Sequence, residues 1–321
     1  MFDIVSSLFS HYTSLSHFSP KTTRGMLYSR RYELPDATTI VPVTKYKLLK
    51  DRILKDPVLR KIPMFEIHEG ASQADLYRVH TKEYIYDFME FIPSNEIISA
   101  EIPLTFEVQE FFLHATAGSI LGLNMARESK GIFVNLSGGF HHAFPDHAEG
   151  FCYINDVCVA IEKEIARKPG KALVLDLDIH QGNGVVNFYK DRSDVLVANL
   201  HQSDNYPLKE AGGINVELES GANGADYLQA LETLLTQVEH QWKAAENSCG
   251  IYLAGADPYR EDKLGGFMLT IEDLANRDRI VKDFFQRLNL PLLCVLAGGY
   301  AEKPEDIVSI YMNLLHEMMS E

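Results

Sequence analysis

Beyond residue 130 the chain contains five short hydrophobic runs that are almost uninterrupted by polar residues. They are rich in β-branched residues and occupy residues 131–138, 171–180, 194–201, 249–257 and 291–300. A continuous pattern, in contrast to strict alternation, is typical of strands that are buried on both faces, as in a parallel sheet. We therefore interpret each run as a strand of such a sheet.

Segments with helical periodicity separate these runs. The segment 225–246 carries its apolar residues on one stripe, formed by Leu228, Leu231, Leu235 and Val238. The segment 270–289 begins with Thr270 and an acidic first turn, which is a signal for a helix start. The alternation of strands and helices predicts an α/β fold with a doubly wound parallel sheet. Because no repeat or linker divides residues 26–321, we expect a single domain there.

Composition narrows the class of protein. A chain of 321 residues with 46% hydrophobic residues suffices for one large core, and no apolar run of membrane-spanning length occurs. The formal net charge of -15 argues against a nucleic-acid partner, because phosphate neutralisation requires a basic face. That charge suits a cationic partner such as a lysine-rich peptide. The four cysteines lack CxxC spacing, so we expect free thiols in a reducing compartment such as the cytoplasm. Nothing in the sequence indicates the oligomeric state.

Residues 1–25 differ in composition from the rest of the chain. They contain six serines and one acidic residue, together with Lys21 and Arg24. We interpret them as an N-terminal extension, either a surface segment ahead of the first strand or an organellar transit peptide. The second alternative would place the protein in an organelle, and a nuclear location is open for a eukaryotic chain.

Polar residues with catalytic potential gather where the predicted strands end. In open parallel sheets, ligands bind beyond the carboxyl ends of the strands. Asp176, Asp178 and His180 alternate at one strand end, so their side chains are predicted to point the same way. Their carboxylates would repel each other unless a cation lies nearby. Asp257 ends another strand, which predicts a catalytic metal held by Asp178, His180 and Asp257, with Zn²⁺ or Fe²⁺ as the ion. Solvated charges on a loop are the alternative.

Several longer motifs carry a resemblance to a known family. They are GGFHHAFPDHAEGFCYINDV (138–157), LDLDIHQGNGV (175–185), LAGADPY (253–259), DKLGGFMLT (262–270) and AGGY (297–300). With them the chain resembles the zinc-dependent histone deacetylases over about residues 26–313, and among these it is most similar to class IV and its bacterial relatives. The resemblance implies the arginase/deacetylase fold, an eight-stranded parallel sheet flanked by helices. It also implies hydrolysis of an acyl-lysine amide in a protein or peptide.

The resemblance assigns roles to individual residues. It makes Asp178, His180 and Asp257 the zinc ligands, His142 the general base and His141 the residue that orients the attacking water. Asp176 would accept a hydrogen bond from His141, and Asn183 would be the partner of His142. Tyr300 would donate its hydroxyl to the oxyanion. A neutral Asn183 raises the basicity of its histidine less than a carboxylate does.

The resemblance also implies a potassium site and a substrate tunnel. The potassium site would be formed by Asp176, Asp178, His180, Asn199 and Leu200. The tunnel would be lined by Gly150, Phe151, Tyr206 and Leu264. The apolar Leu264 stands where polyamine-selective members carry an acid, which favours acyl-lysine. The stretch TIVPVTKY (39–46) lacks the histidine and arginine that class IV members often carry, so the first loop is expected to shape acyl-chain access differently.

Three alternative functions follow from the same motifs. A ureohydrolase-like enzyme on this fold would need ligands for a second metal. The stretch AGADPY contains only one carboxylate, Asp257, so a second metal would lack ligands there. A non-catalytic reader of acylated lysine would be expected to lack a ligand, a histidine or Tyr300. A deacylase of small amides such as acylpolyamines is compatible with every motif.

Overall fold

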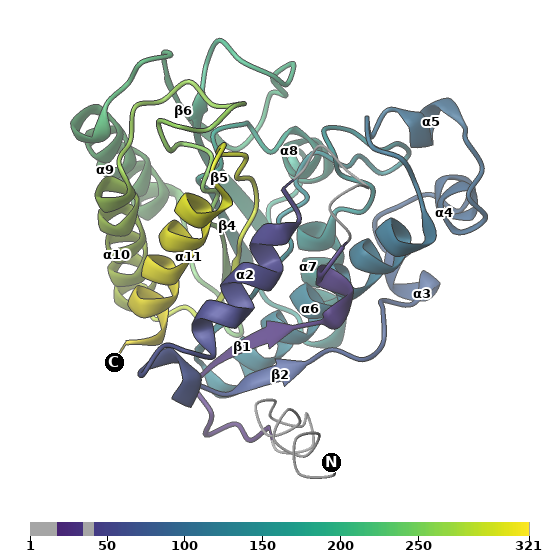
Figure 1. The fold of residues 1–321 in the computed structure, drawn as a ribbon, viewed down its shortest axis with the longest axis horizontal. Coiled ribbons are helices and arrows are strands. Elements are labelled where there is room, and N and C mark those ends of the chain that lie inside the picture. Colours follow the sequence, from purple (N-terminus) through teal and green to yellow (C-terminus); the bar gives the residue numbers. More distant parts are fainter. Residues whose placement is uncertain (1–17, 35–41, 321) are drawn as a thin grey trace.

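The computed structural model describes residues 18–34 and 42–320, and in this part of the chain eight strands form one parallel sheet (Figure 1). The strand order is β2-β1-β3-β8-β7-β4-β5-β6. The strands are β1 (Arg24–Tyr28), β2 (Met64–Glu66), β3 (Ile132–Asn135), β4 (Ala172–Asp176), β5 (Val195–Gln202), β6 (Ile214–Leu218), β7 (Cys249–Leu253) and β8 (Leu292–Val295). This arrangement confirms the α/β fold class and the eight-stranded parallel sheet.

All five strands predicted from hydrophobic runs are present, as β3, β4, β5, β7 and β8. Four of them are shorter than their runs, because the final polar residues lie in the loops after the strand, whereas β5 is as long as its run and ends one residue later. The helix predicted over 225–246 begins at Gly224 and already ends at Gln241. The helix predicted over 270–289 spans Ile271–Arg287, and its Thr270 cap accepts a hydrogen bond from the Asp273 N–H.

Helices cover both faces of the sheet. On one face α2 (Thr44–Ile53), α11 (Pro304–Met319), α10 (Ile271–Arg287) and α9 (Gly224–Gln241) contact one another in this order (Figure 1). The other layer consists of α6 (Phe106–Ser129), α7 (Asp156–Arg167) and α8 (Asn183–Tyr189). Right-handed crossovers between parallel strands explain this division. When the next strand is added on one side of the preceding strand, the connecting helix lies on one face of the sheet. When it is added on the other side, the helix lies on the opposite face.

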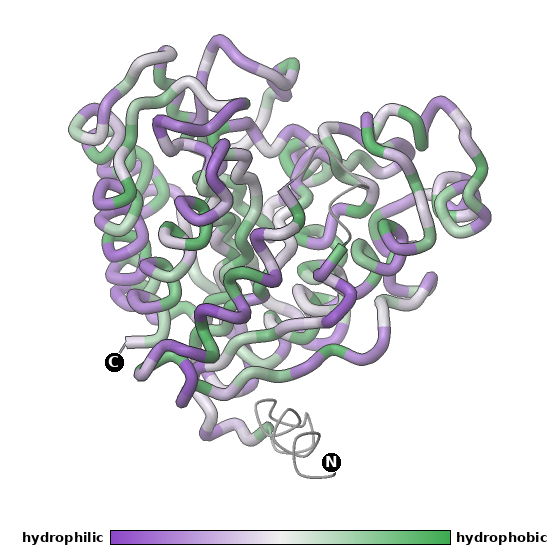
Figure 2. The backbone as a smooth tube through the Cα atoms, in the orientation of Figure 1, coloured by the Kyte–Doolittle hydropathy of each residue, from purple (hydrophilic) through white to green (hydrophobic). Residues whose placement is uncertain are grey.

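Shorter elements complete the chain between β1 and α6. They are the 3₁₀ turns η3 (Arg30–Tyr32) and η4 (Leu59–Lys61) and the helices α3 (Gln73–Leu76), α4 (Lys82–Met89) and α5 (Asn95–Ile98). Hydrophobic residues concentrate along the strands and on the inward sides of the helices (Figure 2). Within the described residues, none of the helices combines the length and the hydrophobicity needed to span a membrane.

The start of the described chain packs on this core. Strand β1 begins at Arg24, and the Phe18 ring lies edge-on against Phe65 and Phe133, with centroid distances of 6.3 and 6.1 Å. Part of the segment expected as an extension therefore contacts the sheet. Residues 1–17 lie outside the described residues, and so do residues 39–41 of the loop in which an altered acyl-chain access is expected.

The four middle strands β3, β8, β7 and β4 determine where the candidate residues meet. Because these strands are parallel and hydrogen-bonded side by side, their carboxyl ends lie along one edge. The loops that follow them carry the His-His pair, the AGGY motif, Asp257 and the DLDIH motif. Segments more than 100 residues apart in the sequence are thus brought to one place, as with Gly298 and Asp178.

Candidate active site

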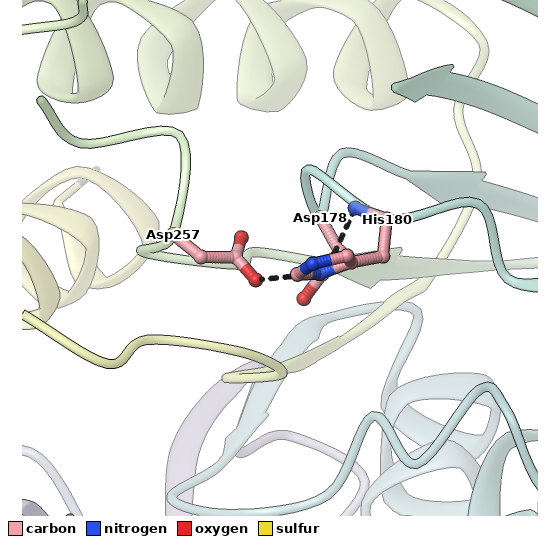
Figure 3. Close-up of side chains that lie close together, drawn as sticks. All are labelled: Asp178, His180 and Asp257. Atoms are coloured by element: carbon pink, nitrogen blue, oxygen red, sulfur yellow. Dashed lines mark hydrogen bonds and ion pairs between the residues drawn. The ribbon is translucent and has the colours of Figure 1, made fainter. Parts of the chain in front are cut away.

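The predicted metal ligands form one buried group beyond β4 and β7 (Figure 3). One ligand atom each from Asp178, His180 and Asp257 can be chosen so that all three lie within 4.8 Å of one another. The His180 Nδ1 lies 3.1 Å from Asp178 Oδ1 and 3.4 Å from Asp257 Oδ2. In the described part of the chain this is the only group of three or more such residues with metal-binding spacing.

Backbone N–H groups hold the two carboxylates in place. Gly298 N–H donates to Asp178 Oδ2 at 2.8 Å, and Ile179 N–H donates to Asp257 Oδ1 at 3.0 Å. Asp257 Oδ2 is buried and has no hydrogen-bond partner among the described residues. A Cβ atom at Gly298 would collide with oxygens of both carboxylates, so only glycine leaves this space open. A buried carboxylate oxygen without a donor is the expected feature of a cation site.

The electrostatics of this group also favour a cation. Burial and the charge of Asp178 raise the pKa of Asp257 to about 7. Burial lowers the pKa of His180, but its close contacts with Asp178 and Asp257 and their negative charges outweigh the effect of burial and raise that pKa to about 10. Both shifts express an excess of buried negative charge, which a divalent ion would neutralise in place of protons. Two carboxylates and one imidazole suit Zn²⁺ or Fe²⁺ with open coordination positions.

The His141–His142 pair lies on the loop after β3. Two features determine the conformation of this loop. Gly139 has a φ of +85°, and a Cβ there would lie 2.8 Å from Ala297. Asp156, the first residue of α7, accepts hydrogen bonds from the N–H groups of Gly139 and Phe140 at 3.0 and 2.8 Å. The conformational freedom of glycine and a buried carboxylate thus set the position of both histidines.

Each histidine has its own polar partner. His141 Nδ1 lies 2.7 Å from Asp176 Oδ2, and His142 Nδ1 lies 2.7 Å from Asn183 Oδ1. The two Nε2 atoms are 3.1 Å apart. Because an amide oxygen only accepts, His142 carries its proton on Nδ1, and its Nε2 is unprotonated and able to act as an acceptor.

The two pKa values diverge accordingly. Burial lowers the pKa of His141, but the charges of Asp176 and Asp178 raise it to about 9. Burial and the neighbouring positive charges of His141 and His180 hold the pKa of His142 well below its usual range. The pair therefore combines a charged imidazole, His141, with a neutral one, His142. A charged imidazole can stabilise negative charge, and a neutral one can act as a base.

A cavity opens from these residues to the surface. It is lined by Glu101, His142, Gly150, Phe151, His180, Tyr206, Leu264 and Tyr300, which include all four residues predicted for the tunnel. The Phe151 ring lies 6.0 Å from that of Tyr300, and the Tyr206 ring lies 5.2 Å from that of His142. The exposed fractions of Tyr206 and Leu264 are 43% and 42%, so both lie at the mouth.

Comparison with known proteins places the chain in a family. The family "Histone deacetylase domain" matches residues 41–314. The chain belongs to the histone deacetylase family. It is therefore a hydrolase of the deacetylase type, in agreement with the resemblance of its motifs. The closer affiliation with class IV stays a prediction.

Individual relatives support this membership. An uncharacterized protein of Picosynechococcus sp. is 30% identical over 285 residues, which cover 86% of this chain and 91% of that protein. Histone deacetylase B of Dictyostelium discoideum is 30% identical over 79% of this chain, and probable histone deacetylase 1-A of Xenopus laevis is 27% identical over 80%. The matches span 63% and 56% of these two deacetylases.

Solved structures agree in fold. The crystal structure of an HDAC homolog complexed with SAHA superimposes with a TM-score of 0.79 at 24% identity, covering 93% of this chain and 85% of that one. An HDAC homolog from Aquifex aeolicus gives a TM-score of 0.78 with the same identity and coverage.

Four polar residues near the site were not identified from the sequence. Lys45 is buried in an inner cavity beside His141, with its Nζ 3.2 Å from the Gly299 carbonyl. Asp262 accepts a hydrogen bond from Tyr300 N–H at 2.6 Å. The other two are Glu101 and Glu149. Asp262, Glu149 and Lys45 lie within stretches quoted above, so their positions were a usable signal, whereas Glu101 lies in a segment without one.

The inner cavity extends behind the histidines. Its apolar lining includes Phe111, Phe112, Phe140 and Tyr46. Burial lowers the pKa of Lys45 to about 8, although the charges of Asp257, Asp262 and Asp178 act in the opposite direction. Apart from this ammonium group and the polar residues of the site, the cavity is lined mainly by aromatic and aliphatic side chains.

Of the residues predicted for potassium, Asp176, Asn199 and Leu200 lie on the neighbouring strands β4 and β5, and Asp178 and His180 lie in the loop after β4. Asn199 of β5 is in register with Asp176 of β4, and Leu200 follows it. Asn199 Nδ2 donates to Asn215 Oδ1 at 3.1 Å, whereas its own Oδ1 is buried without a hydrogen-bond partner among the described residues.

Proposed function

We propose that this protein hydrolyses the amide bond of an acylated lysine in a protein or peptide, with a divalent metal ion, Zn²⁺ or alternatively Fe²⁺, held by Asp178, His180 and Asp257. One observation carries the proposal. The buried two-carboxylate and imidazole group adjoins a neutral histidine, His142, and His180 and His142 line one cavity that opens to solvent. We assign the activity to residues 26–321 as one catalytic domain.

The bound ion would supply Lewis acidity toward the amide carbonyl and toward water. His142 Nε2 takes a proton from the attacking water, whose oxygen forms a bond to the carbonyl carbon. The carbon–nitrogen bond then breaks, and the same proton passes to the leaving lysine amine. The products are a carboxylic acid and the free lysine. Support comes from the Asn183 contact, which keeps the proton of His142 on Nδ1.

Two further residues stabilise charge in this reaction. His141, positively charged beside Asp176, orients the water and offsets developing negative charge. Tyr300 donates its hydroxyl to the oxyanion. Burial, Asp178 and Asp257 raise the pKa of Tyr300 well above its usual value, so its hydroxyl stays protonated and able to donate.

The substrate passage suits the apolar stem of a lysine. Gly150 and Phe151 form one wall, Tyr206 faces them from another loop, and Leu264 lies at the mouth. Aromatic and aliphatic walls accommodate the methylene groups of a lysine side chain. The formal net charge of -15 adds long-range attraction for a lysine-rich partner, and we expect no nucleic-acid or membrane partner.

We also propose a structural potassium ion beside the catalytic group, bound by Asp176, Asp178, His180, Asn199 and Leu200. Its support is the buried Asn199 Oδ1 that lacks a partner among the described residues. All four cysteines are buried free thiols. They are compatible with a reducing compartment, and we propose the cytoplasm.

An acylpolyamine or another small amide is the second candidate substrate. The observation that favours it is Glu101, which lines the cavity. Its carboxylate would attract the ammonium group at the far end of a polyamine. A ureohydrolase-like reaction is less well supported, because the described residues offer only one metal group.

The test compares three substrates with the zinc-loaded protein: an acetyl-lysine peptide, a long-acyl-lysine peptide and an acetylpolyamine. We expect the highest kcat/KM on one of the two peptides and its abolition by a chelator, with recovery on adding zinc. His142→Ala serves as the inactive control. Faster turnover of the acetylpolyamine would replace the proposed substrate class, and no turnover of any acyl amide would contradict the proposed function.

A further inference from the structure

A glutamate lies behind the partner of His142. Asn183 Oδ1 faces His142 Nδ1 at 2.7 Å, and its Nδ2 donates to Glu149 Oε1, also at 2.7 Å. The three side chains form a continuous hydrogen-bonded series from the imidazole to a carboxylate. The exposed fraction of the Glu149 side chain is 25%, so this carboxylate is screened from much of the solvent.

Other groups around Glu149 keep it ionised. The Tyr206 hydroxyl donates to the same Oε1 at 2.9 Å, and His147 Nε2 lies 3.6 Å from Oε2. Burial raises the pKa of Glu149, but the hydrogen bonds from His147, Asn183 and Tyr206 outweigh it and lower that pKa. The hydrogen bond to Glu149 and the contact with Asp146 at 2.8 Å raise the pKa of His147.

An ionised carboxylate determines which way the Asn183 amide faces. A carboxylate only accepts hydrogen bonds, so the NH₂ group of Asn183 must point at Glu149 and its oxygen at His142. With the amide reversed, two acceptors would face each other at Glu149, and His142 would carry its proton on Nε2. The negative charge further polarises the amide, which strengthens the hydrogen bond that its oxygen accepts.

We propose that Glu149 is a positioning residue for the reaction. It acts through Asn183, fixing the amide orientation and therefore the tautomer in which His142 Nε2 is free to accept a proton. The Glu149 carboxylate thus acts on His142 through the Asn183 side chain. It fixes the tautomer of His142, as a carboxylate bonded directly to that histidine would. The inference rests on the proposed role of His142 as base and adds a residue to it.

The test is a double-mutant cycle in the zinc-loaded protein. Glu149→Gln offers a donor as well as an acceptor, so Asn183 can reverse; we expect kcat on the acyl-lysine peptide to fall about 10-fold, as for other outer partners. KM should change little. Asn183→Asp sets a carboxylate against Glu149 and should also lower kcat. The double variant places a carboxylate on His142 and a donor behind it, so it should turn over faster than either single variant.

His147→Gln is the matched control. It changes the contact at Glu149 Oε2 but leaves the hydrogen bond from Asn183 to Glu149 Oε1 in place. Because His147 does not line the cavity, we expect kcat and KM of this variant to stay near the wild-type values. If His147→Gln reproduced the kcat loss of Glu149→Gln, or if the double variant were as slow as the product of the two single effects, the proposal would be overturned.

A measurement without turnover separates this inference from the proposed function. In ¹⁵N-histidine NMR spectra of the zinc-loaded protein, His142 should be protonated on Nδ1 alone. The Glu149→Gln variant should show a population protonated on Nε2. An unchanged tautomer in that variant contradicts the role of Glu149, whether or not the wild-type protein hydrolyses acyl-lysine. A changed tautomer in a protein that is inactive on acyl-lysine would leave the role of Glu149 standing and refute the proposed function.

Discussion

Two buried clusters of charged side chains lie at opposite ends of the sheet, and they differ in charge balance. Near the amino ends of β4 and β7, Glu164 faces Arg127 at 3.2 Å and Arg167 at 2.8 Å. Arg127 also donates to the carbonyls of Glu164, Lys168 and Asn247 at 2.6 to 2.8 Å. A guanidinium group in this arrangement neutralises the carboxylate and ties three segments together.

The cluster at the carboxyl ends has the opposite balance. Asp178 and Asp257 share one imidazole, and Asp257 Oδ2 has no hydrogen-bond partner among the described residues. Burying unpaired charge is costly unless a counterion compensates. The comparison shows that burial and acidity alone do not distinguish a functional cluster from a structural one. What distinguishes them is whether the protein itself supplies the compensating cation.

The largest expected effect is on turnover at the carboxyl end. His142→Ala should lower kcat by about 10²–10⁴-fold, because it removes the general base. The metal content should stay unchanged, since His142 is not among the proposed ligands. Steady-state kinetics with elemental analysis of the same sample checks both statements. Near-wild-type kcat in this variant would remove His142 from the role of base.

Tyr300→Phe sharpens the same comparison with a smaller change. The ring that packs 6.0 Å from Phe151 is retained and one donor is lost. We expect kcat to fall about 10²–10³-fold, as for other oxyanion donors. Binding of a metal-directed hydroxamate, measured by calorimetry, should weaken only modestly. A raised KM with unchanged kcat would instead indicate a role in uniform substrate binding.

At the amino end the expected effect is on stability. Arg127→Met removes the buried one of the two guanidinium groups that compensate Glu164 and leaves three carbonyls without their donor. The free energy of unfolding should fall by about 3–5 kcal/mol, as when one member of a buried ion pair is removed. Urea denaturation measures this loss. Zinc content and kcat of the folded variant should match the wild type, and a loss of bound zinc would contradict the separation of the two clusters.

The smallest effect is a pH dependence of the metal-free protein. Burial lowers the pKa of His180, but contacts with Asp178 and Asp257 raise it to about 10, whereas a histidine in the unfolded chain has a pKa of about 6.5. The proton on His180 therefore adds stability that is complete below about pH 6.5 and is lost as pH rises toward 10. In chelator, the free energy of unfolding should fall more steeply from about pH 7 to 9 in the wild type than in His180→Gln. Equal slopes would contradict this.

The sequence predicted the centre of the sheet better than its margins. Strands β3, β4, β5, β7 and β8 are continuous hydrophobic runs, which is the pattern of strands covered on both faces. The missed strands lack that pattern. Strand β2 has three residues, β1 begins with Arg-Gly, and the edge strand β6 reads INVEL with partly exposed positions. Their number was known only through the family resemblance.

The candidate site follows the same division. Asp178, His180 and Asp257 could be grouped from the sequence because each directly follows a recognisable strand, and parallel strands end at one edge. Glu149 could not be linked to Asn183, because the contact spans 34 positions and depends on the path of a loop. The orientation of the Asn183 amide is likewise a property of the assembled hydrogen bonds, which no local pattern encodes.

The central claim is that the uncompensated cluster holds a single catalytic metal ion. Elemental analysis of the purified wild-type protein and of Asp257→Ala, paired with hydrolysis rates on an acyl-lysine peptide, tests it most directly. We predict one divalent ion per chain in the wild type, and loss of both the ion and the activity in Asp257→Ala. Two ions per wild-type chain, or an Asp257→Ala variant that keeps its metal and its activity, would contradict the account.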